Sequence, residues 1–216
     1  MKTIDAKTKD LKALNSALKE TVNGKSVKVR NAAQLHGIGA GLHYGEVIIQ
    51  GNAGDYAGVL NAGATVRITK NAAKYAGDNM TAGAIIIDGN ADSGAGQYCY
   101  GGILVVRGDA GDFTATMNKG ATIIIAGNVG NEAGTYMLKG DLIVVGNAGE
   151  NFANYLIRGS VFIGGQWKSL GHNTKIEPLN EEDLARLKAY FETYRIEADP
   201  KKFRKIVAAT EKPFYN

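Results

Sequence analysis

Six-residue segments of one kind recur along this chain: VIIQGN at 47–52, VRITKN at 66–71, IIIDGN at 85–90, LVVRGD at 104–109, IIIAGN at 123–128, LIVVGN at 142–147 and VFIGGQ at 161–166. The interval between the starting positions is constant along the whole series. An apolar triplet, once with a polar middle member, leads into a turn that is rich in Gly and Asn. A fixed period near 20 residues is typical of a solenoid.

A unit of this length has room for a short β-branched run and a turn, but not for a helix. The sequence therefore predicts an all-β fold, a single-stranded right-handed parallel β-helix with about seven coils of about 19 residues. Equivalent residues of successive coils would then lie about 4.8 Å apart, which is the ordinary distance between strands.

Two columns of the repeat carry residues that a coil corner requires. The first reads Asn52, Asn71, Asn90, Asp109, Asn128 and Asn147, which predicts a ladder of side-chain amides bonded to one another and a left-handed backbone. The second contains only Gly and Ala, as expected for positive φ or close backbone contact. The predicted structural residues are Gly51, Gly54, Gly58, Gly77, Gly96, Gly127, Gly130 and Gly134, together with Asn52, Asn71, Asn90, Asn128 and Asn147.

The segments at the two ends differ in composition from the coils. We expect an N-terminal helical cap over 1–26, the β-helix domain over 27–170 and a C-terminal helical tail over 171–216. The first helix would lie within 1–23, start at Thr8 or Asp10 and end at Gly24. Its stripe of Leu11, Leu14 and Leu18 would cover the first coil or dock a partner.

Two more helices are predicted in the tail. Asn180 precedes a helix over Glu181–Tyr194, and a second short helix is expected over Lys201–Thr210. They would cap the second end of the solenoid or reach out to another chain. Trp167 replaces the small residue of its column, as if a large ring closed the apolar end.

No catalytic or metal-binding constellation is predicted. Position 55 and its equivalents read Asp55, Lys74, Ser93, Asp112, Asn131 and Glu150, so no two neighbouring coils both carry an acid at this position for glycoside chemistry. The histidines His36, His43 and His172 and the single cysteine Cys99 lack ligand spacing. His36 is interpreted as a surface residue, and Cys99 as a reduced, buried thiol.

The segment Gly37-Ile38-Gly39-Ala40-Gly41-Leu42 has the first two glycines of a dinucleotide-binding loop but Leu42 at the third. Another strand follows it where that loop needs a helix, so phosphate binding is not predicted.

Charge and hydropathy argue against a nucleic-acid-binding protein and against a membrane-spanning protein. The net charge is +4, but residues 37–170 carry 8 basic and 10 acidic residues, a difference of −2. A groove for nucleic acid would need its positive charge on the coils. The chain has no apolar run of membrane-spanning length and no signal-peptide pattern at Met1, so a cytoplasmic protein is expected.

The coils resemble the C-terminal β-helix of the glutamate synthase large subunit, the GXGXG domain. The pattern Gly-x-x-Gly-x-x-x-Gly occurs at 51–58 and 127–134, and the segments 71–83 and 146–152 resemble two further coils of that family. The resemblance covers about residues 27–165.

This resemblance implies a non-catalytic subunit that holds separate glutaminase and FMN-dependent synthase chains and helps couple ammonia transfer between them. FMN and an iron–sulfur cluster would lie on those partners, with no cofactor on this chain. Residue 2 is Lys2 and Cys99 is interior, so the exposed N-terminal cysteine of the glutaminase is missing. Free-standing versions also occur in N-methylglutamate synthase.

Other functions are left open by the sequence. The same domain type occurs in the C subunit of formylmethanofuran dehydrogenase, which has molybdopterin-enzyme partners. A β-helix can also be an enzyme acting on a polymer along one face. Finally, open coil ends can stack, so a self-assembling structural protein or a homo-oligomer is a third alternative.

Overall fold

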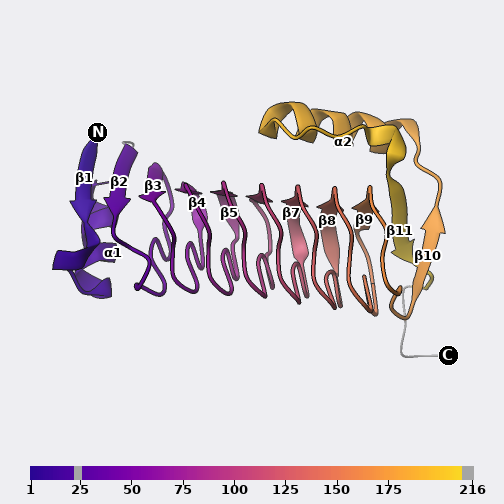
Figure 1. The fold of residues 1–216 in the computed structure, drawn as a ribbon, viewed down its shortest axis with the longest axis horizontal. Coiled ribbons are helices and arrows are strands. Elements are labelled where there is room, and N and C mark those ends of the chain that lie inside the picture. Colours follow the sequence, from indigo (N-terminus) through magenta and orange to yellow (C-terminus); the bar gives the residue numbers. More distant parts are fainter. Residues whose placement is uncertain (22–25, 211–216) are drawn as a thin grey trace.

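The computed structural model describes residues 1–21 and 26–210, which form an elongated parallel β-solenoid of about seven coils (Figure 1). Its strands are β1 (Lys2–Asp5), β2 (Ser26–Arg30), β3 (Glu46–Gln50), β4 (Ala62–Ile68), β5 (Ala82–Ile87), β6 (Ile103–Val106), β7 (Lys119–Ile125), β8 (Lys139–Val144), β9 (Ser160–Ile163), β10 (Thr174–Glu177) and β11 (Arg204–Ala208). Its helices are α1 (Leu11–Thr21) and α2 (Glu181–Tyr194), with 3-10 turns η1 (Ala6–Thr8) and η2 (Pro200–Lys202). The predicted solenoid is thus confirmed.

One sheet of 11 strands runs along the molecule in the order β1-β2-β3-β4-β5-β6-β7-β8-β9-β11-β10. The strands from β1 to β9 pair in parallel, each with the next in the chain. From β3 onward the main register is the sequence period, as in Val47 opposite Val66 and Val66 opposite Ile85. Identical positions therefore lie above one another.

The apolar triplet divides its side chains between the two faces of this sheet. The first and third members, such as Ile123 and Ile125, are fully buried inside the coils. The middle member points to the outer face, because successive side chains of a strand alternate. The opposite wall is made of single paired residues, running from Ala53 and Ala72 to Trp167.

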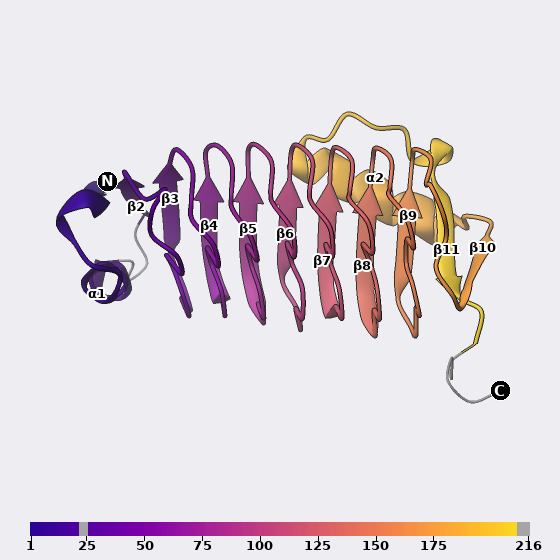
Figure 2. The same cartoon turned by 60° about the horizontal axis from the view of Figure 1, so that its bottom comes forward.

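Helix α2 covers the outer face of the sheet over β6–β9 (Figure 2). The outward middle residues Val105, Ile124, Ile143 and Phe162 form a second apolar cluster with Leu187, Phe191, Ile196 and Phe203 of the tail. The helix begins as predicted: Asn180 accepts from the backbone of Asp183, and the Asp183 carboxylate accepts from the Asn180 backbone. The alternation of the triplet explains the docking, since an apolar middle member needs a cover.

The second predicted helix of the tail, over Lys201–Thr210, is wrong. This segment forms η2 and then β11, which pairs antiparallel with β9 through Ile206 opposite Val161. Ile206 faces the coil interior while Phe203 packs on Phe191 outside, at a ring distance of 5.3 Å. Over so short a segment, the apolar residues of an alternating strand resemble a helical stripe. The tail therefore extends the sheet with β11 and β10, and it packs α2 on its own coils.

The helix predicted over 1–23 is also only partly right. Lys2–Asp5 form β1, which pairs with β2 and buries Ile4, and α1 begins after Asp10, whose carboxylate accepts from Ala13 at 2.7 Å. Leu14 and Leu18 are fully buried in the main core and cover the first coil, whereas Leu11, the third member of the predicted stripe, is 36% exposed. Gly24, the predicted end of the helix, lies outside the described residues.

Candidate functional site

Each coil turns through a corner in which three alternate residues have positive φ. In one coil these are Tyr56, Gly58 and Leu60, with φ of 57°, 71° and 58°. The later corners have the same geometry at Tyr75, Gly77 and Asn79, at Gly94, Gly96 and Tyr98, at Phe113, Ala115 and Met117, at Glu132, Gly134 and Tyr136, and at Asn151, Ala153 and Tyr155. Bonds between coils support the corner: Gly58 donates to the carbonyl of Ile38 at 2.9 Å.

The glycine segment at 37–41 is the first corner of this series. Gly37, Gly39 and Gly41 lie one repeat before Tyr56, Gly58 and Leu60 and have φ of 79°, 72° and 60°. A left-handed backbone costs an ordinary residue about 1–2 kcal/mol, and glycine avoids this cost. The segment is therefore a corner of the fold, not a phosphate-binding loop.

The Asn column forms a ladder, but not the predicted one. The side-chain oxygen of each residue accepts the backbone N–H of its equivalent in the next coil, as from Asn71 to Asn52 at 3.1 Å and from Asn90 to Asn71 at 2.9 Å. Within the described coils, Asn128 also donates its side-chain amide, to Asp109. No member of the column has positive φ, so the predicted amide ladder and left-handed Asn backbone are both wrong.

A second ladder follows position 55, which the sequence suggested only as a place to look for acids. The backbone N–H of Lys74 bonds Asp55 at 3.0 Å, and that of Asn131 bonds Asp112 at 2.7 Å. His36 begins this column, since its Nδ1 accepts the backbone N–H of Asp55 at 3.1 Å. Each of these N–H groups lies one repeat after a side-chain acceptor, which was the signal that could have revealed the ladder. The ladder is interrupted at Ser93, which follows Lys74 and whose backbone N–H bonds Asp92 instead.

Two buried asparagines, Asn61 and Asn118, complete the strands β4 and β7. The Asn118 amide donates to the carbonyl of Ala121 at 2.8 Å, and its oxygen accepts from the Ala121 N–H at 2.9 Å. Asn61 bonds Ala64 in the same way. The parallel register shifts by one residue beside each of them. Both side chains thus replace a backbone partner inside the core.

We predict that Asn118→Leu lowers the free energy of unfolding by about 1–3 kcal/mol, because Ala121 keeps two buried backbone groups without partners. Met137 lies one coil later in the same column and is also fully buried. Met137→Leu is the matched control and should cost less than about 1.5 kcal/mol. Urea unfolding followed by circular dichroism measures both, and equal losses would contradict the role assigned to Asn118.

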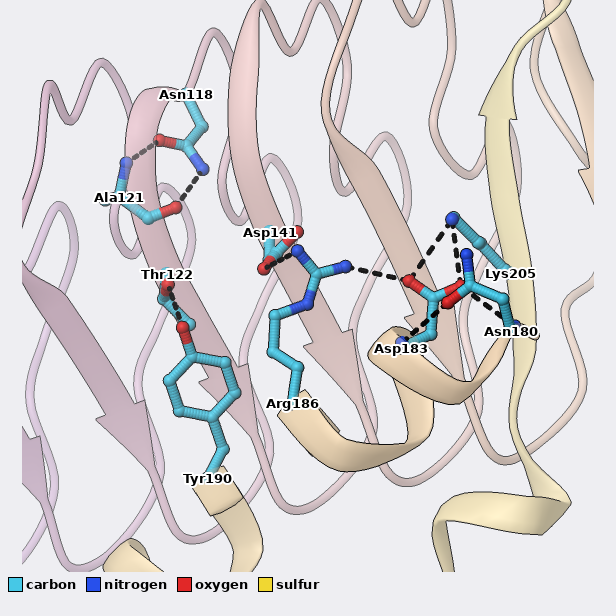
Figure 3. A network of polar contacts seen from close by, with 9 residues as sticks. All are labelled: Asn118, Ala121, Thr122, Asp141, Asn180, Asp183, Arg186, Tyr190 and Lys205. Atoms are coloured by element: carbon cyan, nitrogen blue, oxygen red, sulfur yellow. Dashed lines mark hydrogen bonds and ion pairs between the residues drawn. The ribbon is translucent and has the colours of Figure 1, made fainter. Parts of the chain in front are cut away.

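A charged network clamps α2 to the sheet (Figure 3). The Asp183 carboxylate, 2% exposed, accepts from Lys205 of β11 at 2.9 Å and from Arg186 at 2.9 Å. Arg186 also lies 3.4 Å from Asp141 of β8. Further along α2, the Tyr190 and Thr122 hydroxyls are 3.1 Å apart. These contacts fix the rotation of α2 about its own axis on the apolar outer face of the sheet.

The two carboxylates of this network respond oppositely to their surroundings. Burial raises the pKa of Asp141, and the charge of Arg186 opposes this only in part. Burial would also raise the pKa of Asp183, but the hydrogen bonds from Lys205 and Asn180 and the charges of Lys205 and Arg186 hold it below its usual value. Asp183 is therefore the ionised anchor of the clamp.

The remaining residues that were considered for chemistry are dispersed. His43 lines a surface cavity of about 280 Å³ with Lys19, Leu42 and Tyr44, and His172 rests against the ring of Tyr155. Within residues 1–21 and 26–210, no three His, Cys, Asp or Glu side chains lie close enough to hold a metal ion. No helix in the described part of the chain is long and apolar enough to cross a membrane.

Cys99 is fully buried, as predicted, and burial raises the pKa of its thiol to about 12. Because the thiolate is the reactive form, iodoacetamide at pH 8 should leave the folded protein unmodified for hours. The same reagent should alkylate the protein rapidly in denaturant, and mass spectrometry distinguishes the two states. Rapid labelling under native conditions would show that this coil opens.

Several aromatic side chains of the coils lie at or just after the corners. Tyr56, Tyr100 and Phe113 are 39%, 54% and 49% exposed, and Leu60 is 55% exposed. Tyr56 stacks on Tyr75 at 4.8 Å between ring centres, and Lys119 lies 4.2 Å from the ring centre of Tyr100. We use the name tyrosine edge for the surface formed by these side chains of the coil corners: Tyr56, Leu60, Tyr75, Tyr98, Tyr100, Phe113, Tyr136 and Tyr155.

These features define a class: a parallel β-solenoid whose coils turn through corners with three alternate left-handed residues, all glycine at 37–41, and are joined by polar ladders. The family model described as the GXGXG motif matches residues 26–213. The chain therefore belongs to the GXGXG family, the family of the glutamate synthase C-terminal domain. A search of curated proteins found no match.

Proposed function

We propose that this chain is the non-catalytic assembly subunit of a glutamate-synthase-type complex. It would position a separate glutaminase chain and a separate FMN-dependent synthase chain and help couple ammonia transfer between them. The observation that carries the proposal is the family match over 26–213, since this family is tied to glutamate-synthase-type proteins.

The chemistry of the coils is consistent with a scaffold. The polar columns are engaged in bonds between coils, as at Asn71 and Lys74, and the buried Asn61 and Asn118 bond their own strands. The FMN and the iron–sulfur cluster of such a complex are assigned by this proposal to the partner chains.

The tyrosine edge is the surface that we assign to the partners. Exposed aromatic groups are enriched in protein interfaces, because they bury a large area at a small entropic cost. The edge also runs the length of the coils, so two chains could bind side by side. Such an arrangement would fix the distance between their active sites.

Co-purification from the native host tests this proposal. We expect a glutaminase-like chain and an FMN-binding chain to accompany the tagged protein. Recovery of molybdopterin-enzyme subunits instead would assign the chain to a formylmethanofuran-dehydrogenase-type complex. Phe113→Asp on the tyrosine edge should weaken the contact of the chain bound at that coil at least tenfold, and Asp tolerates the left-handed backbone there. Lys188→Asp on the solvent side of α2 is the control.

A further inference from the structure

Strand β10 is the free outer edge of the sheet at its C-terminal end. It pairs with β11 on one side, and no described strand pairs with its other side. It reads Thr174-Lys175-Ile176-Glu177, and Ile176 is 53% exposed. An unpaired strand edge offers backbone N–H and C=O groups to another chain.

We propose that two copies of this chain pair through β10, antiparallel, about a two-fold axis at Ile176. The two sheets would then form one continuous sheet with the two solenoids end to end. A two-fold interface uses the same patch on both copies, so the assembly closes at two chains.

The charges of β10 select this pairing. With Ile176 opposite its equivalent, Lys175 of each copy lies opposite Glu177 of the other. Opposite charges across a strand pair stabilise it, whereas like charges destabilise it. Within one chain the two side chains already pair at 2.8 Å with their charged ends half-exposed, so they lie on the same face of the strand. A lysine alone on the edge would repel the lysine of a second copy. Here each copy carries both a lysine and a glutamate, so the two edges are complementary in charge.

The faces of the strand also agree with this arrangement. Ile176 lies opposite Ile206, which is buried in the coil interior, so Ile176 is on the core side. Glu177 lies opposite Lys205, which reaches Asp183 of α2, so the charged residues are on the helix side. A two-fold axis perpendicular to the sheet places the core side of one copy next to the core side of the other. The half-exposed Ile176 would then be covered by its equivalent.

The opposite edge of the sheet is less suited to a second copy. In β1, Ile4 is 5% exposed and already buried under its own chain. Asp5 accepts hydrogen bonds from Arg30 and Asn31, so its carboxylate is already paired within its own chain. An apolar contact and a self-complementary charge pair are therefore offered by β10 rather than by β1.

Sedimentation velocity of the full chain over a range of concentrations tests the proposal. A four-residue strand pair buries less than the roughly 800 Å² per partner of a stable interface, so we expect a weak dimer that dissociates in the range of about 10–100 μM. High salt should weaken it. Only monomer at all concentrations, or open-ended polymers from β10 meeting β1, would overturn the proposal.

Charge-reversed variants make the test specific. K175E has two acids on the edge and E177K has two lysines, so each alone should self-associate at least tenfold more weakly than the parent. An equimolar mixture should restore the dimer, because each acid then faces a lysine. Circular dichroism controls for folding. Failure of the mixture to associate would overturn the two-fold register, as would dimerisation that either variant leaves unchanged.

Residues 211–216, which lie outside the described part, are the other candidate occupant of this edge. If they cover β10, the full chain should be monomeric and only the chain without them should dimerise. That result would overturn the proposal for the full chain. If the parent dimerises and the deletion leaves its dissociation constant unchanged, the free edge of β10 is sufficient for the pairing.

Discussion

Replacing Gly140 by alanine should destabilise the protein by more than about 4 kcal/mol or prevent folding. Gly140 has φ of 87°, and its added Cβ would lie among the backbone atoms of the preceding coil, including the carbonyl oxygen of Ala121, the carbonyl carbon of Gly120 and the N of Ala121. Backbone cannot move aside without breaking the β7–β8 ladder. Thermal unfolding by calorimetry, or the soluble yield, measures the effect.

Gly134→Ala is the matched control for this variant. Gly134 also has positive φ, at 77°, but its Cβ would meet the flexible side chains of Leu142 at 3.2 Å and Met137 at 3.5 Å and the Ala153 backbone at 3.5 Å. Ala115 and Ala153 already occupy equivalent positions. We expect a loss of about 1–2 kcal/mol, the cost of a left-handed alanine. Similar losses for both variants would contradict the role of backbone contact.

Asp183→Ala should cost about 3–5 kcal/mol, because it leaves Lys205 and Arg186 without their shared buried carboxylate. The loss should be local, with α2 released from β6–β9 while the inner coils stay protected. Hydrogen exchange of α2 against that of β5 distinguishes release of the helix from global unfolding. Glu182→Ala, one residue earlier and exposed, is the control and should be within about 0.5 kcal/mol of the parent.

The same carboxylate gives a pH dependence. The pKa of Asp183 is lowered in the folded protein from its ordinary 3.8, so its contribution is fully present above that value. It is lost as the pH falls through the lower folded pKa, since the unfolded chain binds the proton first. The variant should lack this part of the acid-induced loss. An acid titration curve parallel to that of the parent would contradict the assignment.

The sequence was sufficient for the coils because one period carried both the strands and the turns. The constant spacing of the repeat predicted the parallel register, and the inward and outward triplet positions follow from strand alternation. The ends were harder to predict. Lys2–Asp5 and Arg204–Ala208 are short segments whose strand state depends on pairing with β2 and β9, far away in the sequence.

The polar columns show a different limit. Periodicity identified the Asn column, but the partner of each oxygen depends on the direction of the backbone N–H groups, which the spacing does not give. The same limit concealed the second ladder, to which Asp55 and His36 belong. The clamp at Asp183 was missed because Lys205 of β11 and Asp141 of β8 come from other elements, although Arg186 lies three residues after Asp183 on α2 itself.

The rungs of both ladders share one polarity: the later coil donates its backbone N–H, and the earlier coil supplies the accepting side chain. During synthesis, each coil that has already emerged would present a finished row of acceptors to the next one leaving the ribosome. Folding can therefore proceed from the N-terminal end, with each folded coil setting the register of the next. The α1 cap would be in place first, before any coil needs it.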